Sequence, residues 1–383
     1  MTARHAAIWG QALRSEWDLD PTFLTVNHGS FGAAPRVVRA EQDAWRARME
    51  AQPTRFMVAL PALLRQAADT LGRFVGATGP DIAFVANATT GCNAVLRSLR
   101  LQPGDEIMVL NHVYGAVRNT VHYVASQAGA TIREAVLPFP GTTEDAAVDA
   151  VARALTPRTR LAVIDHITSA SALVLPLRRI VAACKAAGVP VLVDGAHAPG
   201  QIDIDLTAIG ADWYTGNCHK WLCAPKGSAF LWTASDRQAD LHPTVISHGL
   251  DQGYLSEFDW VGTSDPTALL AVPAAIRFHQ HLGGADMRAR NIALAADAAA
   301  WVARQLNTGI ATEGGMAGAM ALVRLPIAGD PLAFRAKLLE AGTDVPVHAI
   351  GGINWLRLSA FAYNDIDDYV RLADIVTHVI RDT

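Results

Sequence analysis

The stretch from Val191 to Lys220 constrains the fold of this chain more than any other. It begins with an apolar run, Val-Leu-Val, that ends in Asp194 and Gly195. Such a run is typical of a buried parallel strand, which would place the Asp194 carboxylate at its carboxyl end. Lys220 follows 26 residues later, directly after His219 and a run of small or polar residues. The sequence therefore predicts a carboxylate and a lysine near the same edge of a sheet.

Strands and helices alternate on both sides of this stretch. Strands are expected at 82–87, 106–110 and 161–166, and helices at 145–155 and 178–187. Repeated units of this length predict an α/β fold with a large, doubly wound, mostly parallel sheet. Ligands of such sheets gather at the carboxyl ends of the strands. The polar residues that fall at or just after predicted strand ends are Thr89, Tyr114, Ser169, Asp194 and Lys220.

The pattern changes beyond about residue 250. An Ala-rich helical region spans 268–306, with a break at Gly283-Gly284, and short strands alternate with helices after it. We therefore expect a large domain at 23–255 and a smaller α+β domain formed by 1–22 and 256–383. With 383 residues, of which 51% are hydrophobic and 18% charged, the chain is long and apolar enough to build both cores.

Composition argues against several partners and locations. The net charge is −4 and there is no basic run, so neither nucleic acid nor an anionic membrane is an expected partner. No apolar stretch reaches about 18 residues, and residues 1–20 lack the apolar core of a secretion signal. The cysteines form no CxxC pair, so they predict reduced thiols, no metal site and a cytoplasmic setting. They are Cys92, Cys184, Cys218 and Cys223.

A carboxylate at a strand end and a lysine in a turn are the two groups that a pyridoxal phosphate (PLP) enzyme needs. The lysine forms a Schiff base with the cofactor, and the carboxylate pairs with the protonated ring nitrogen. Thr89 and Thr90 stand where a predicted strand gives way to a helix, a place where amide groups and the helix dipole favour a phosphate. An ordinary capped helix has the same pattern. A dinucleotide-binding oxidoreductase is not expected, because no GxGxxG opens a predicted strand–helix unit.

With these residues in place, the chain resembles the class V aminotransferase family of PLP enzymes, which have fold type I. It is most similar to the isopenicillin N epimerase-like branch. The resemblance runs from Asn27 to Ser359. Its most specific segments are Asp194-Gly-Ala-His197, His219-Lys220 with the following Lys226-Gly227, and the run from Asp259 to Pro266.

The resemblance implies a role for each candidate residue. Lys220 would hold the cofactor and move the α-proton, Asp194 would pair with the ring nitrogen, and Tyr114 would stack on the ring. His197 and Ser169 would face the phenolic oxygen of the cofactor. The phosphate would contact Thr89, Thr90, Asn217, His219 and, from the neighbouring subunit of a homodimer with shared sites, Thr263. Asn217 departs from the Ser or Thr of many members but keeps a donor amide. Arg357 would bind the substrate carboxylate by a bidentate fork, with Asn27 as a second substrate-binding residue.

The reaction is less constrained than the cofactor. The resemblance favours an epimerase or aminotransferase that acts at the α-carbon of an amino acid. Epimerisation needs a second proton donor opposite Lys220, for which Tyr114 or a histidine is a candidate. A β-lyase acting on a cysteine sulfoxide and a catalytically idle PLP-fold binding protein remain alternatives. A cysteine desulfurase is disfavoured, because no cysteine follows Cys223. Asp165 and His166 are left without a role.

Overall fold

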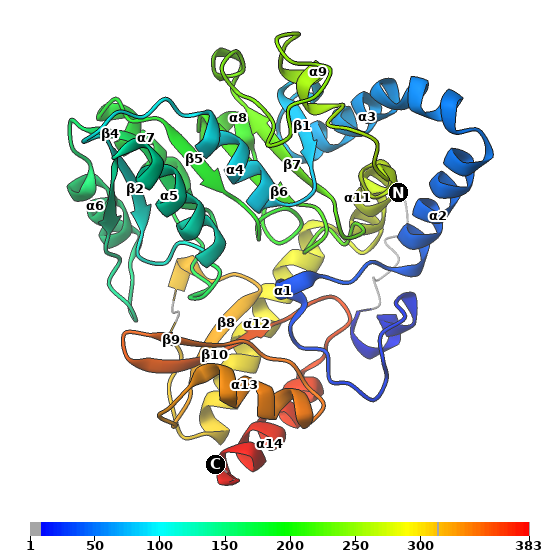
Figure 1. The fold of residues 1–383 in the computed structure, drawn as a ribbon. Coiled ribbons are helices and arrows are strands. Elements are labelled where there is room, and N and C mark those ends of the chain that lie inside the picture. The colour runs from blue at the N-terminus through cyan, green and yellow to red at the C-terminus, as the bar shows by residue number, and fades with distance from the viewer. Residues whose placement is uncertain (1–8, 312–313, 383) are drawn as a thin grey trace, which may run out of the picture.

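The computed structural model describes residues 9–311 and 314–382. It contains two lobes, a large one around a seven-stranded sheet and a smaller one that carries the C-terminus (Figure 1). The predicted small domain includes residues 1–8, which lie outside the described residues. The strands of the large sheet are β1 (Ile82–Val85), β2 (Glu106–Leu110), β3 (Thr131–Ala135), β4 (Thr159–Asp165), β5 (Val191–Asp194), β6 (Trp213–Asn217) and β7 (Ala229–Thr233).

The strands lie in the order β1-β7-β6-β5-β4-β2-β3. Every neighbouring pair from β3 to β6 is parallel, while β7 is antiparallel to both β6 and β1. The predicted mostly parallel, doubly wound sheet is therefore confirmed. Five of the strands are buried along their whole length. Each fully buried Val or Leu in them stabilises the fold by about 1.5–3 kcal/mol.

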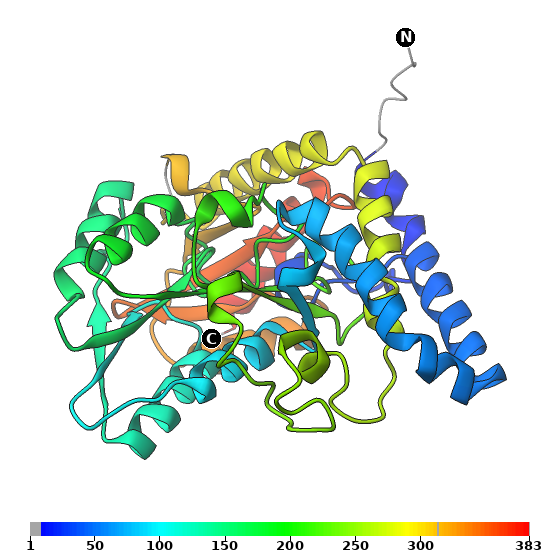
Figure 2. The ribbon, with the colours of Figure 1, turned by 90° about the horizontal axis from the view of Figure 1, so that it is seen from above.

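Helices cover both faces of this sheet, as the view from above shows (Figure 2). One face packs against α4 (Ala88–Ser98), α5 (Gly115–Ala128) and α9 (Tyr254–Phe258). The other core contains α3 (Pro53–Val75), α6 (Glu144–Ala154), α7 (Leu177–Ala186), α8 (Leu206–Ile209) and α11 (Val272–His281). The helices α2 (Arg36–Ala51) and α10 (Thr267–Leu270) pack on α3, and short 3-10 turns are η1 (Gly10–Glu16), η2 (Gly79–Asp81) and η3 (Ser235–Arg237).

The small lobe is built on an antiparallel sheet with a core of its own. Its strands are β8 (Met320–Arg324), β9 (Val347–Ile350) and β10 (Ile353–Ser359), with β10 in the middle. They pack against α12 (Ala285–Gln305), α13 (Pro331–Glu340) and α14 (Ile366–Arg381), and the 3-10 turn η4 (Gly314–Met316) precedes β8. The predicted α+β character of this lobe is confirmed.

The division between the two cores differs from the expected boundaries. The apolar side chains of α10 and α11 belong to the core of the large lobe, whereas α12 joins the small-lobe core from Leu294 onward. Leu24 and Val26, near the other end of the chain, pack in the small-lobe core. The change of core therefore falls within α12 rather than at residue 256, because an amphipathic helix does not specify in its sequence which core it will cover.

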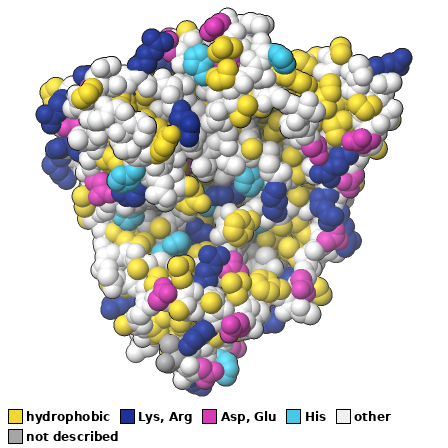
Figure 3. Space-filling model, in the orientation of Figure 1, with side chains coloured by type: hydrophobic (Ala, Val, Ile, Leu, Met, Phe, Trp, Pro, Cys, Tyr) yellow, Lys and Arg dark blue, Asp and Glu magenta, His cyan; other side chains and the backbone are white. Residues whose placement is uncertain are grey.

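Two further observations bear on what surrounds the molecule. No helix among the described residues is long and apolar enough to cross a membrane. On the face shown in Figure 3, positive and negative side chains are interspersed rather than gathered into patches of one sign.

Candidate active site

A cavity lies at the carboxyl ends of β4, β5 and β6, between the large sheet and the short helix α1 (His28–Phe31). It contains about 640 Å³ of empty space. Its wall includes seven of the residues to which the sequence assigned cofactor roles, together with Lys220. They are Thr89, Tyr114, Ser169, Asp194, His197, Asn217 and His219.

Lys220 lies in the turn that connects β6 to β7. Its Nζ is 3.1 Å from Nε2 of His197, on the loop that follows β5. Burial lowers the pKa of Lys220 to about 8, although the nearby Asp194 opposes the shift. An amine with this pKa is unprotonated in a substantial fraction of molecules near neutral pH, which is the form that attacks a carbonyl carbon.

Two carboxyl groups share the floor of the cavity. Asp194 ends β5 and Asp165 ends β4, and the two residues are direct partners in the parallel ladder. Oδ1 of Asp194 accepts a hydrogen bond from the amide of Ala196 at 3.0 Å. Oδ2 of Asp165 is buried and has no hydrogen-bond partner among the described residues. Burial raises the pKa of both groups, and that of Asp165 is raised further by the charge of Asp194.

Position 195 is glycine because the backbone there is packed against the ring of Tyr214. A Cβ at this position would lie 2.2 Å from the Tyr214 hydroxyl oxygen, so no larger residue fits without displacing the ring. The Tyr214 hydroxyl is also 2.9 Å from Nδ1 of His166. His166, which had no predicted role, is therefore part of the packing beneath the cavity floor.

The first turn of α4 forms the polar end of the cavity. Asn87 caps the helix and accepts a hydrogen bond from the amide of Thr90 at 2.8 Å. Oδ1 of Asn217 accepts one from the amide of Ala88, also at 2.8 Å. The bond from Ala88 occupies Oδ1 of Asn217 and leaves its side-chain NH₂ as a donor. Thr89 lines this cavity, whereas Thr90 lines a separate apolar hollow on the other side of the turn.

His219 is oriented by the backbone of the strand that follows it. Its Nδ1 lies 3.0 Å from the carbonyl oxygen of Ser228, which can only accept, so this nitrogen carries a proton. Burial lowers the pKa of His219 to about 4, which keeps the ring neutral in the cofactor-free protein. The other nitrogen, Nε2, is then an acceptor.

Arg357 reaches the edge of the cavity from β10 in the small lobe. One end of its guanidinium donates to the carbonyl oxygen of Ser169 at 2.6 Å, and the other donates to Oγ of Ser30 at 2.9 Å. Asn27 contributes a longer contact of 3.4 Å. Both Ser169 and Ser30 line the cavity, so the buried guanidinium lies directly behind its wall.

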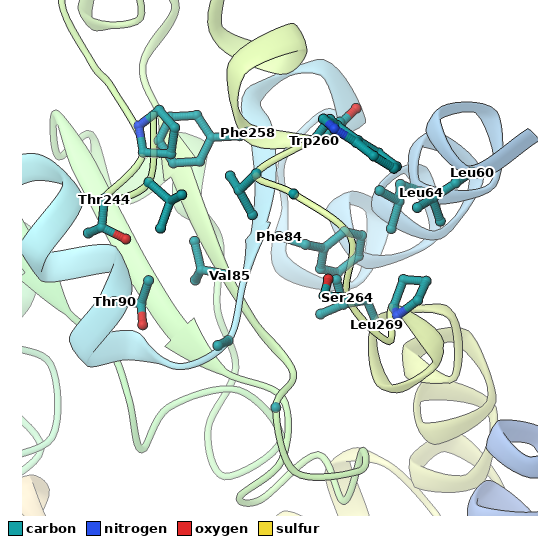
Figure 4. A pocket seen from close by; sticks show the side chains of 18 of the residues that line it. Leu60, Leu64, Phe84, Val85, Thr90, Thr244, Phe258, Trp260, Ser264 and Leu269 are labelled. Carbon is teal, nitrogen blue, oxygen red and sulfur yellow. The ribbon is translucent and has the colours of Figure 1, made fainter. Parts of the chain in front are cut away.

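Thr263, another predicted site residue, also lies away from the cavity within one chain. It is exposed, in a loop whose neighbours Gly262 and Ser264 line the apolar hollow beside α4. Figure 4 shows this hollow, with Phe258 on one side and Trp260 beside Leu60 and Leu64 of α3 on the other.

Sequence reasoning missed three polar residues that line the cavity. Ser30 had no predicted role, Asn87 was only the end of an expected strand, and Asp165 was left without a role. The signal was present for Asn87, since Asn before a helix is a strong cap. Nothing local identifies Ser30, because its partner Arg357 is 327 residues away.

The residues present fit PLP. The cavity offers a lysine amine for the aldehyde, a buried aspartate for the ring nitrogen, and a helix N-terminus with polar side chains for the phosphate. In addition, Oδ2 of Asp165 has no hydrogen-bond partner among the described residues, so the floor of the cavity holds a polar atom that the protein itself does not use.

Comparison with solved structures places the fold. A mutant of C-DES with glycine covalently linked to its PLP cofactor superposes with a TM-score of 0.81, covering 95% of this chain and 98% of the other at 23% identity. A cysteine desulfurase from Thermococcus onnurineus gives 0.84, with 98% and 99% covered, at 15% identity. The chain therefore has the fold of PLP-dependent enzymes of fold type I.

Comparison of sequences identifies the family. The model of the family "Aminotransferase class-V" matches residues 28–313. An isopenicillin N epimerase from Amycolatopsis lactamdurans is 35% identical, with 98% of this chain and 100% of the other covered. A probable chloroplastic L-cysteine desulfhydrase from Arabidopsis thaliana is 33% identical, with 95% and 84% covered. This chain belongs to the class V aminotransferase family, and its cofactor is PLP.

Proposed function

We propose that this protein is an amino-acid epimerase, in which Lys220 and Tyr114 move protons to and from the α-carbon of the substrate. The observation that carries the proposal is that the side chains lining the cavity include both the Lys220 amine and the Tyr114 hydroxyl, each able to carry a proton. Bound PLP supplies an electron sink for the charge that develops at the α-carbon. The sequence identity to two isopenicillin N epimerases supports the same reaction for this protein.

Lys220 is the proposed first base. The pKa of its amine, lowered to about 8, lies close to neutral pH, where a base and its conjugate acid are both available. Tyr114 is the proposed second group. It stands at the N-cap of α5 and is about half exposed, so its hydroxyl can exchange protons with water as well as with the substrate.

Arg357 is the proposed anchor of the substrate carboxylate. Its charge is buried and its hydrogen bonds go to neutral oxygens of Ser169, Ser30 and Asn27, with no carboxylate among these partners. A buried cation without a charged partner gains from an incoming carboxylate, and a planar guanidinium can bind it with two parallel bonds. Asn27 holds the turn in place, since its side chain also binds Asp344 at 2.7 Å.

A homodimer with shared sites is part of the proposal. The loop that contains Thr263 is exposed, and it borders a hollow with an apolar lining. Val245 and Val261, two exposed apolar side chains, belong to that lining. Exposed apolar side chains around such a hollow are typical of an interface between subunits. A second copy docked there would bring its own Thr263 loop to the α4 end of the first copy's cavity.

A second candidate is a β-lyase that acts on cysteine or a related sulfur amino acid. It is favoured by the identity of 33–34% to L-cysteine desulfhydrases of two plants, over 93–95% of this chain. A lyase needs Lys220 as base and Arg357 as anchor, but it has no need of a second proton donor at Tyr114.

The experiment is to incubate the PLP-loaded protein with single L-amino acids in deuterated water. The epimerase proposal predicts deuterium at the α-carbon together with loss of chirality. In Tyr114→Phe, deuterium should still enter but chirality should be kept, because only Lys220 would return the hydrogen. Tyr123→Phe is the matched control, since Tyr123 lies exposed on α5 and does not line the cavity.

Other products would contradict the epimerase proposal. Pyruvate, ammonia and sulfide from cysteine would establish the lyase instead, and a keto acid that forms only with an added acceptor would establish a transaminase. Absence of any exchange at the α-carbon across the panel would reject all three reactions and favour a binding protein.

A further inference from the structure

The inference concerns Trp221, which follows Lys220 in sequence and lines none of the described cavities with its side chain. The indole is buried, with 1% of the residue exposed, and its ring centroid lies 5.3 Å from that of His28 and 6.2 Å from that of Phe361. A Cβ on Gly29 would be only 3.0 Å from Cζ2 of the indole. The ring is therefore closely enclosed, and the direction of its N–H group is fixed.

That N–H group points at His197. Nε1 of Trp221 lies 3.4 Å from Nδ1 of His197, the imidazole that also contacts Lys220. An indole nitrogen can only donate, so Nδ1 of His197 has to accept. Burial lowers the pKa of His197 far below its usual value, as do the charges of Lys220 and Arg357, and the ring is therefore neutral. A neutral imidazole that accepts at Nδ1 carries its single proton on Nε2.

The consequence falls on Lys220, because Nε2 of His197 is the atom 3.1 Å from Nζ. An N–H group at Nε2 can donate to the lone pair of an amine. An ammonium group has three N–H donors and no lone pair, so it would meet the imidazole donor to donor. The contact is favourable with the free amine and unfavourable with the ammonium. In the opposite tautomer, with the proton on Nδ1, the imidazole and indole N–H groups would instead face each other.

We propose that Trp221 is a positioning residue that fixes the tautomer of His197 and thereby favours the unprotonated form of Lys220 before the cofactor binds. The proposal rests on the proposed function in one respect, the role of Lys220 as the amine that captures PLP. The first observable, the position of the proton on His197, belongs to the cofactor-free protein and does not depend on that role.

The test is to replace Trp221 with β-(3-benzothienyl)alanine, which keeps the shape of the indole but has sulfur in place of the N–H group. In the cofactor-free wild-type protein, ¹⁵N NMR should find the proton of His197 on Nε2. The analogue should lose this preference. The rate of PLP capture rises with pH as Lys220 loses its proton, and the midpoint of this rise should move upward by about 0.5–1 pH unit in the analogue.

Two further variants of the protein complete the test. The same replacement at Trp232, whose buried indole nitrogen has no hydrogen-bond partner among the described residues, should change neither observable. Trp221→Phe should shift the midpoint in the same direction, and its thermal unfolding shows whether the fold survives. A wild-type His197 protonated on Nδ1, or an unchanged midpoint in the analogue, would overturn the proposal. Failure of PLP to attach at Lys220 of the wild-type protein would reject the proposed function. The NMR result would still decide the tautomer of His197.

Discussion

Asp165 and Asp194 are paired in register at the carboxyl ends of neighbouring parallel strands, and both carboxyl groups are buried in one cavity. The Asp194 carboxylate has an amide donor, whereas Oδ2 of Asp165 has no partner in the described part of the chain. Two carboxylates buried in one cavity cannot both ionise without a large cost in free energy. The cofactor-free protein therefore keeps a proton on the pair at a pH where exposed carboxyl groups have lost theirs.

Asp165→Asn should stabilise the cofactor-free protein at neutral pH. Burial raises the pKa of Asp165 in the folded state above its usual 3.8, so between those two values the folded state binds more protons than the unfolded one. The free energy of unfolding of the wild type then falls as pH rises through this window, and Asn removes the loss. We expect a gain of about 1–3 kcal/mol at pH 7 that disappears below about pH 4.

Urea unfolding at a series of pH values measures this gain. Asp297→Asn, on an exposed position of α12, is the matched control and should leave the curve unchanged. A destabilised Asp165→Asn, or a gain that is the same at every pH, would show that the Asp165 carboxyl is ionised in the folded protein.

Lys220→Ala should abolish covalent attachment of PLP. The Nζ of Lys220 lies in the cavity, whereas Lys226 is exposed and donates to the carbonyl oxygen of Gly32 at 2.9 Å. After borohydride reduction, mass spectrometry should find the cofactor adduct on the wild type and on Lys226→Ala, and none on Lys220→Ala. An adduct that persists in Lys220→Ala would assign the attachment to another residue.

Arg357→Lys should weaken substrate binding without weakening PLP binding. The guanidinium spans from Ser169 to Ser30, a fork that an ammonium group cannot reproduce. Loss of one charge-assisted hydrogen bond to the substrate carboxylate should raise KM by about 10- to 100-fold. Arg324→Lys, on an exposed position of β8, serves as the control. A KM unchanged by Arg357→Lys would remove this residue from the substrate site.

Mixing two inactive variants tests the shared dimer. Thr263→Glu would place a negative charge beside the phosphate of the partner's cofactor, and Lys220→Ala lacks the attachment point. A mixed dimer contains one site with both defects and one with neither, so random mixing should restore about a quarter of wild-type activity. No restoration, with mixed dimers demonstrated by mass, would show that the Thr263 loop acts within its own chain, and a Thr263→Glu variant that is active alone would show that the loop has no role in the site.

The sequence predicts well what depends on short-range pattern. The apolar run that ends at Asp194 and the helix that follows Asn87 are where the periodicity places them, because strand burial and helix capping are local properties. The contacts that join distant segments were not predictable in this way. The indole of Trp221 contacts His197 because the pairing of β6 with β5 brings the segments that follow these strands together. A helix such as α11 does not encode in its sequence which core it will join.

The turn from Asn27 to Ser30 touches Arg357 from the opposite end of the chain, while the residues proposed to hold PLP stand at the carboxyl ends of the large sheet or in the loops that follow them. The Asn27 side chain donates a hydrogen bond to Asp344, which also accepts two hydrogen bonds from Arg335. In the proposed site, the anchor of the substrate carboxylate and the residues that hold the cofactor are thus encoded in different parts of the gene. Changes in the two terminal segments would then alter how the substrate is held and leave the cofactor-binding residues of the sheet in place, a layout that suits divergence into relatives as unlike as epimerases and desulfhydrases.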